Sequence, residues 1–205
     1  MAIEHRDENN LYDIRLHGRG GQGTVSAAAL LALAAFEDGF ESQAFPKFGS
    51  ERRGAPVEAY VRISNAEIRV HNQIYKPDAI VIQDATLLHS KTVLQGLKNG
   101  GLVVLNSEKQ AADFKKASNS NFNWICIPAS SIAQELLGKP LPNTVLLGAL
   151  SACSGWVSCS ALEQAVTNHL ASKGEKIVKA NIDAIREGYR LGTVVNDFNK
   201  DKVIS

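Results

Sequence analysis

The chain has 205 residues, of which 44% are hydrophobic and 21% charged, as expected for one soluble globular domain with a substantial core. Its formal net charge is +1, so no overall field indicates a nucleic-acid-binding or membrane-surface protein. The most apolar run, residues 27–36, is too short to span a membrane. Residues 1–10 resemble neither a secretory signal nor a transit peptide, so we expect a cytoplasmic protein.

The cysteines and histidines form no recognisable metal or catalytic motif. Cys126, Cys153 and Cys159 include no C-x-x-C pair, which argues against a disulfide framework, a zinc ribbon or an iron–sulfur site within this chain. We expect each to be a buried small hydrophobe. The chain also has no G-x-S-x-G elbow and no H-E-x-x-H helix. We therefore predict no catalytic residue and no metal ligand here, and no cofactor bound by this chain alone.

The amino-terminal third is predicted to form a strand, a turn and a helix. Residues 12–17 alternate polar and apolar side chains as a strand does, and a glycine-rich turn follows at once. An Ala- and Leu-rich helix then begins at Thr24 or Ser26, runs to about Asp38 and stops at Gly39. This helix is apolar nearly all round, so we expect it to be buried on several sides.

The middle of the chain alternates predicted strands and helices. Strands are expected at 40–45, 57–64, 66–71, 78–84, 102–106 and 123–129, and helices at 85–97, 108–117 and 130–137. Residues 57–64 and 66–71 suggest a hairpin inserted beside a parallel sheet. The β-branched run 78–84 is typical of a strand covered on both faces. The alternation predicts βαβ units.

The carboxyl-terminal third is predicted to be helical, over 143–156, 160–174 and 175–192. Ser160 and Glu163 fit a capping box. An apolar stripe along one helical face is formed by Val178, Ile182, Ile185 and Tyr189. We expect a single domain over 1–205, with 1–10 and 193–205 as flexible or partner-docking tails. The predicted fold is α/β: three layers, a mostly parallel sheet with helices on both faces, a β-hairpin insertion and a helical carboxyl-terminal third.

The turn after the first strand carries the first candidate site. Gly18, Gly20 and Gly23 fit G-x-G-x-x-G between a strand and a helix, where backbone amides can receive a phosphate. A dinucleotide fold also needs an acid at the end of the second strand, whereas Glu41 opens that strand. Two interpretations stay open: an anion site, or glycines that only let strand, turn and helix pack closely.

A basic loop carries the second candidate site. Lys47, Arg52 and Arg53 lie in the long segment 45–56, and arginine forks suit phosphate or carboxylate. The alternative is a solvated loop that pairs with Glu51 and Glu58. Because the loop follows the second strand, we expect it at the same sheet edge as the glycine turn. His17 also adjoins that turn, and we expect its ring to be satisfied by the backbone.

Three blocks together resemble one family. They are HGRGGQGTVSAA (17–28), AFPKFGSERRGAPVEAYVRIS (44–64) and LPNTVLLGAL (141–150), with DAIVIQD (78–84) between them. The chain from about Tyr12 to Tyr189 resembles the gamma subunit of the 2-oxoacid:ferredoxin oxidoreductases, most closely the pyruvate enzymes.

The resemblance implies one part of a larger enzyme. The complex would oxidatively decarboxylate a 2-oxoacid with coenzyme A to acyl-CoA and carbon dioxide, and pass electrons to ferredoxin or flavodoxin. Alpha, beta and delta partners would carry thiamine pyrophosphate, Mg²⁺ and the [4Fe-4S] clusters. This chain would help to form the coenzyme A site. The candidate binding residues are Gly18, Arg19, Gly20, Gly21, Gln22, Gly23, Thr24, Lys47, Arg52, Arg53 and Gly54.

Two alternatives remain beside this interpretation. One is a free-standing NAD- or FAD-dependent oxidoreductase, and the other is a pure assembly module whose turn and loop only contact partner subunits. Neither nucleic acid nor a membrane is expected as a partner, whereas the isolated chain could form a homodimer.

Overall fold

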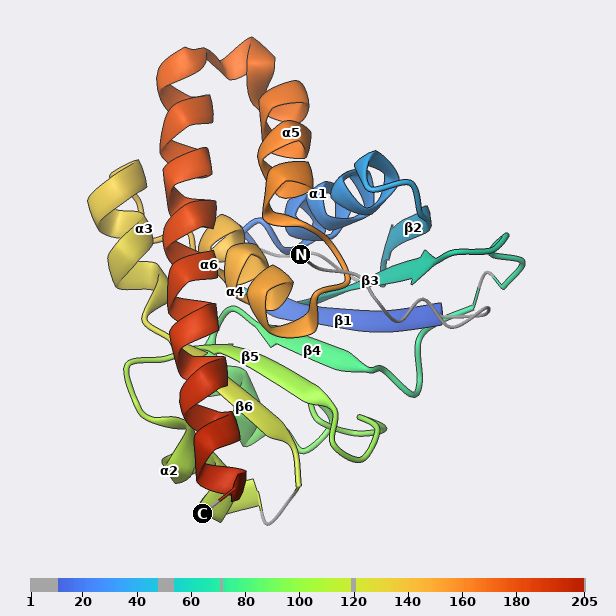
Figure 1. The fold of residues 1–205 in the computed structure, drawn as a ribbon, viewed down its shortest axis with the longest axis vertical. Helices are drawn as coiled ribbons and strands as arrows, with labels where there is room; N and C mark the ends of the chain where they lie inside the picture. The colour runs from blue at the N-terminus through green and yellow to red at the C-terminus, as the bar shows by residue number, and fades with distance from the viewer. Residues whose placement is uncertain (1–10, 48–53, 71, 119–120, 205) are drawn as a thin grey trace.

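The computed structural model describes residues 11–47, 54–70, 72–118 and 121–204, which form a six-stranded sheet in the order β2-β3-β1-β4-β5-β6 (Figure 1). The strands are β1 (Leu11–Arg19), β2 (Glu41–Pro46), β3 (Pro56–Ser64), β4 (Ala79–Ile82), β5 (Leu102–Asn106) and β6 (Asn123–Ile127). The helices are α1 (Thr24–Glu37), α2 (Ala111–Ser118), α3 (Ala129–Leu137), α4 (Asn143–Ser154), α5 (Cys159–Leu170) and α6 (Glu175–Ile204), with short 3-10 helices η1 (Ala85–His89) and η2 (Ala171–Lys173).

The sheet is parallel from β1 through β4 and β5 to β6, and antiparallel where β3 pairs with β1 and with β2. Because β3 reverses between them, β1 and β2 run in the same direction. The carboxyl ends of β1, β2 and β4 therefore lie at one edge of the sheet, where ligands bind in open α/β folds. The predicted mostly parallel α/β fold is confirmed.

Alternate residues of the strands feed two separate cores, as the two-residue period of a strand requires. Ile14, Leu16 and Val81 enter the larger core, which α1, α3, α4, α5 and α6 cover. Ile80 and Val103 enter a smaller core on the opposite face, beneath α2 and residues 85–97. More helices therefore cover the larger core than the smaller one. Figure 1 shows α4 and the long α6 stacked on one side of the sheet.

Glycines let α4 and α6 cross at very short range. A methyl group on Gly188 would fall 1.9 Å from the carbonyl oxygen of Val145, and one on Gly148 would fall 2.1 Å from that of Ile185. Gly192 likewise faces the backbone of Ala149. The prediction that the helix ends at Gly192 is wrong for this reason: Gly192 is a contact residue, and α6 continues to Ile204. Residues 193–204 are therefore helical, and their predicted docking to a partner stays a prediction.

The predicted helix over 85–97 is also wrong. Only η1 forms there, with Asp84 as its cap, and the chain then turns back towards the sheet. Gly96 adopts a φ of +80°, which a helix interior does not allow, and a methyl group on it would fall 2.0 Å from the Tyr75 carbonyl oxygen. Packing against residues 74–77 therefore overrides the helical pattern.

The predicted strand over 66–71 does not form over its described residues, 66–70. β3 already has β1 on one side and β2 on the other, so it has no free edge for a hairpin partner. Side chains hold this segment instead: Arg62 donates to the carbonyl of Val70, and Gln43 to that of Ile68. The antiparallel insertion exists, but it is built from β2 and β3.

The capping box predicted at Ser160 and Glu163 is wrong as well. The helix α5 starts one residue earlier, and Ser158 is its cap, with its hydroxyl accepting from the amide of Ala161. Glu163 instead forms an ion pair with Arg186 of α6 at 2.7 Å. The other predicted strands and helices are found, with ends shifted by a few residues.

Candidate functional site

The glycine turn joins the carboxyl end of β1 to α1 at the predicted edge of the sheet. Gly21 and Gly23 adopt φ values of +97° and +74°, a region that glycine enters without strain. The Gln22 amide donates to the Arg19 carbonyl, and the Gln22 side-chain oxygen accepts from the Arg19 amide at 2.8 Å. The turn is thereby closed on itself by one side chain.

Two of the glycines are required by close packing. A methyl group on Gly18 would fall 2.2 Å from Thr24 Oγ1 and 2.6 Å from Gln83 Oε1. One on Gly23 would fall 2.7 Å from Asn143 Nδ2, which belongs to the first turn of α4. The packing interpretation of these glycines is therefore correct at both positions, and it leaves room for an anion above Gly21, whose surroundings are open.

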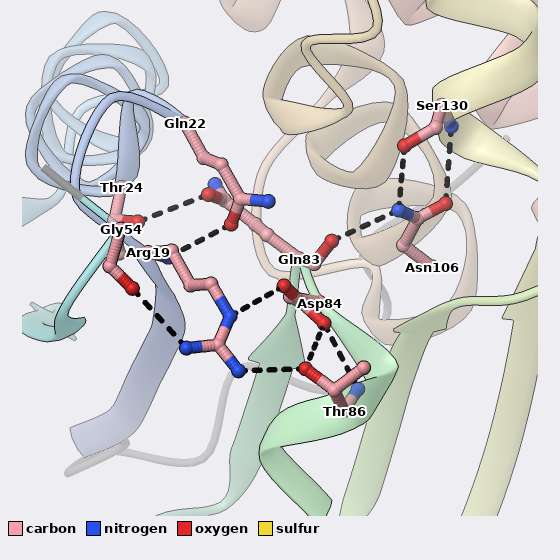
Figure 2. Close-up of polar contacts among 9 residues, drawn as sticks. All are labelled: Arg19, Gln22, Thr24, Gly54, Gln83, Asp84, Thr86, Asn106 and Ser130. Carbon is pink, nitrogen blue, oxygen red and sulfur yellow. Dashed lines mark hydrogen bonds and ion pairs between the residues drawn. The ribbon is translucent and has the colours of Figure 1, made fainter.

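Arg19 ties the turn to two neighbouring segments (Figure 2). Its guanidinium donates to Asp84 at 2.7 Å, to Thr86 Oγ1 at 2.7 Å and to the Gly54 carbonyl at 3.1 Å. Burial opposes ionisation of Asp84, but hydrogen bonds from Thr86 and Arg19 outweigh it and hold the pKa of this carboxyl below its ordinary value. The structure thus shows Arg19 as a clamp. Its predicted contact with a ligand stays a prediction.

The basic loop returns to the same turn, as the topology predicts. The Gly54 amide donates to the Gly20 carbonyl, and the Gly20 amide donates to the Ala55 carbonyl. Lys47 forms an ion pair with Glu58 at 3.0 Å, which matches part of the solvated-loop alternative. Arg52 and Arg53 lie outside the described residues, so their positions stay a prediction.

A polar chain runs along the sheet edge beside the turn (Figure 2). Thr24 donates to Gln83 Oε1, and Asn106 donates both to the Gln83 carbonyl and to Ser130 Oγ. The Ser130 amide donates back to Asn106 Oδ1 at 3.0 Å. The Gln83 side chain is 1% exposed, and its amide nitrogen has no hydrogen-bond partner among the described residues. A buried donor is thus held next to the turn.

Three helices begin at this edge. α1 starts behind Gly23, α3 starts at Ala129 behind β6, and α4 starts at Asn143 against Gly23. No side chain caps α1, because its cap residue is a glycine, and its first turn holds no acid. Helix amino termini carry partial positive charge, so their meeting favours an anion. The edge is chemically suited to bind phosphate.

Sequence reasoning missed several residues of this edge. Gln83 directly follows β4, Asn106 is the last residue of β5, and Asn143 is the third residue of the third recognised block and the first of α4. The signal was available, because polar residues at the carboxyl ends of adjacent parallel strands converge. The tertiary contact between Asn143 and Gly23 had no signal in the spacing.

The described residues contain no group of three or more His, Cys, Asp or Glu side chains placed to hold a metal ion. The three cysteines form no disulfide and are half-buried, less than the full burial predicted for them. Burial raises the pKa of the Cys126 thiol to about 12 and, with Glu163, that of Cys159 to about 11, so both are protonated at neutral pH. Among the same residues, no helix is both long and apolar enough to cross a membrane.

The chain is similar to known proteins over most of its length. The family model described as pyruvate ferredoxin/flavodoxin oxidoreductase matches residues 13–191. A pyruvate synthase subunit PorC of Methanosarcina barkeri is 45% identical over 75% of this chain and 84% of its own. A common gamma subunit of pyruvate/ketoisovalerate oxidoreductases from Thermococcus kodakarensis is 43% identical over 86% of this chain and 97% of its own.

A solved structure agrees with these relatives. The pyruvate oxidoreductase subunit PORC of Thermotoga maritima superposes with a TM-score of 0.78 at 35% identity, over 88% of this chain and 96% of its own. The comparisons support neither a free-standing dinucleotide enzyme nor a pure assembly module. The three recognised blocks all fall inside the matched range. The chain belongs to the pyruvate ferredoxin/flavodoxin oxidoreductase family.

Proposed function

We propose that the chain is the gamma subunit of a cytoplasmic multisubunit 2-oxoacid:ferredoxin oxidoreductase whose substrate is pyruvate. The observation that carries this proposal is the match to gamma subunits along nearly their whole length. The complex oxidatively decarboxylates the 2-oxoacid and transfers the acyl group to coenzyme A, and the electrons leave to ferredoxin or flavodoxin. Alpha, beta and delta partners carry thiamine pyrophosphate, Mg²⁺ and the [4Fe-4S] clusters.

The part assigned to this chain is to hold phosphate groups of coenzyme A at the glycine turn. The uncapped start of α1, the open space above Gly21 and the buried amide nitrogen of Gln83 support this role. Lys47, Arg52 and Arg53 add cations from the loop that ends at Gly54. Arg19 acts here by holding that loop against the turn through the Gly54 carbonyl.

The test is a kinetic measurement on the assembled enzyme. The double variant Arg52→Ala, Arg53→Ala removes two charge-assisted contacts, so the KM for coenzyme A should rise about tenfold or more while kcat stays within about twofold. The KM for pyruvate should not change.

The matched control removes two exposed cations near the start of α6, with Lys176→Ala and Lys179→Ala, and should leave all three constants unchanged. An unchanged KM for coenzyme A in the Arg52, Arg53 variant would contradict the phosphate role. Loss of the complex without a selective effect on coenzyme A would favour the assembly alternative.

A further inference from the structure

The face of the sheet opposite α1 carries a cluster of polar side chains that the proposed function does not use. Arg15 and His17 point from β1 to this face, because their neighbours Ile14 and Leu16 enter the larger core. The register pairs Arg15 with Tyr60 and His17 with Glu58 on β3. The four side chains therefore form one cross-strand patch.

This patch lines a cavity of about 830 Å³. Residues 73–76 and 87–96 form the remaining walls, with Ile74, Tyr75 and Val93 as apolar surfaces and Lys76 at the side. Volumes of about 300 to 1,000 Å³ are typical of sites for small organic ligands. Among the candidate binding residues that the structure describes, Lys47 also lines this cavity.

Two polar side-chain atoms of the patch are buried without a partner among the described residues. Arg15 and His17 are 6% and 7% exposed, and neither Arg15 Nε nor His17 Nε2 has a hydrogen bond to the described residues. The expectation that the backbone satisfies the His17 ring fails at this nitrogen. Leaving such groups unpaired costs free energy, and a ligand that accepts from them would recover it.

The charge of the cavity wall is positive. The Glu58 carboxylate forms an ion pair with Lys47 at 3.0 Å and accepts a hydrogen bond from the Tyr60 hydroxyl. The Arg15 guanidinium, in contrast, donates to the carbonyl oxygens of Val93 and Gln95, both at 2.8 Å, and takes part in no ion pair within the described part of the chain. A partly desolvated guanidinium with no ion-pair partner of its own favours carboxylate or phosphate as a ligand.

We propose that this cavity is a second ligand site, distinct from the glycine turn, for an organic anion with a flat apolar body. The anionic group accepts from Arg15 and His17, and the body lies between Tyr60, Tyr75 and Ile74. Carboxylates and phosphates share this chemistry, and the two are distinguished by the probes below.

The test is calorimetric titration of the full chain and of the assembled complex. The probes are 2-naphthoate and adenosine 5′-monophosphate, with the neutral 2-naphthamide and adenosine as their matched partners. At least one anion should bind, about tenfold or more tightly than its neutral partner. Binding of naphthoate alone assigns a carboxylate ligand, and binding of the nucleotide alone assigns a phosphate ligand.

Arg15→Met keeps much of the side-chain length and should weaken anion binding about tenfold or more, whereas Arg190→Met, an equal change of charge on α6, should not. If Arg15→Met fails to fold by its thermal transition, Lys76→Met at the cavity wall takes its place, with an expected loss of about threefold.

Three results would overturn the proposal. Neither anion binds at millimolar concentration, or the neutral partners bind equally well. The third is that the cavity variant that folds, Arg15→Met or otherwise Lys76→Met, leaves the affinity for the anion unchanged.

Saturating coenzyme A serves to separate the two sites. It should leave the affinity for the bound probe within about twofold, and complete displacement would instead make the cavity part of the glycine-turn site. Because the naphthoate titration does not depend on coenzyme A binding, its outcome is independent of the proposed function.

Discussion

At the scale of single residues, the glycine turn is fixed by close packing and by the hydrogen bonds of one arginine. Gly18 leaves no room for a side chain beside Thr24 and Gln83, and Gly23 leaves none beside Asn143. The Arg19 guanidinium donates hydrogen bonds to Asp84, Thr86 and the Gly54 carbonyl. These contacts hold the turn in place, so the backbone amides would need little reordering if the turn binds an anion as proposed.

The Arg19 clamp predicts measurable coupling between Arg19 and Asp84. Arg19→Met and Asp84→Asn should each lower the free energy of unfolding by about 1 kcal/mol, and the double variant should lose less than their sum by about 1 kcal/mol. Urea denaturation of the four proteins measures this cycle. The exposed pair of Glu187 and Arg190 is the control and should show clearly weaker coupling. Strict additivity at Arg19 and Asp84 would show that the clamp contributes nothing.

His17 predicts a pH dependence of stability. Burial lowers the pKa of His17 from 6.5 to about 4 in the folded chain. Between these values the unfolded chain binds the proton and the native chain does not, so stability rises with pH from about 4 to about 6.5. At neutral pH the His17 ring is uncharged in both states. The free energy of unfolding is then ~3 kcal/mol higher than at pH 4 because of this one group.

The measurement compares wild type with His17→Gln by urea denaturation at pH 4.5 and pH 7. The gain in stability between the two pH values should be ~2 kcal/mol smaller in the variant, because glutamine does not titrate. Equal gains in both proteins would mean that His17 is not kept neutral by burial.

At the scale of elements, the contact between α4 and α6 depends on glycine. Gly188→Ala would place a methyl group 1.9 Å from the Val145 carbonyl oxygen, so the two helices must separate. The variant should lose about 3 kcal/mol of stability, as overpacked cores do. Lys179→Ala, on an exposed position of the same helix, should change stability by no more than about 0.5 kcal/mol. A Gly188→Ala protein as stable as wild type would contradict the close crossing.

Prediction from the sequence succeeded where local pattern and final packing agree. The run 78–84 is β-branched and central in the sheet, and Gly39 ends α1 as its position after an Ala-rich run suggests. It failed where tertiary contacts decide. Gly192 has the local signature of a helix end, yet its role is to admit the backbone of Ala149, which cannot be inferred without knowing which helix lies opposite.

The candidate site likewise has residues that local pattern predicts and residues that only tertiary contacts bring together. The glycine spacing and the basic residues are local, so the turn and Lys47 could be found in advance. Gln83, Asn106 and Asn143 come from three other elements, and only the fold brings them to the turn. Asp84 and Thr86 could not be assigned to Arg19 from spacing, because 65 residues separate Arg19 from Asp84.

At the scale of the whole molecule, the two proposed ligand sites lie in different places on the sheet. The edge where α1, α3 and α4 begin suits phosphate, and the opposite face of β1 and β3 lines a cavity with a buried guanidinium. A gamma subunit built in this way can contribute a ligand site to a larger enzyme while its partners carry the redox chemistry. We therefore expect this chain to assemble with the redox subunits and to be active only as part of that complex.

That claim is tested most directly by isolating the tagged chain from its native cells without oxygen and measuring ferredoxin reduction. We predict that thiamine- and iron–sulfur-bearing subunits co-elute with it, and that ferredoxin is reduced only when pyruvate and coenzyme A are both present. A chain that elutes alone, supports no such reduction and binds NAD or FAD by itself would contradict the account.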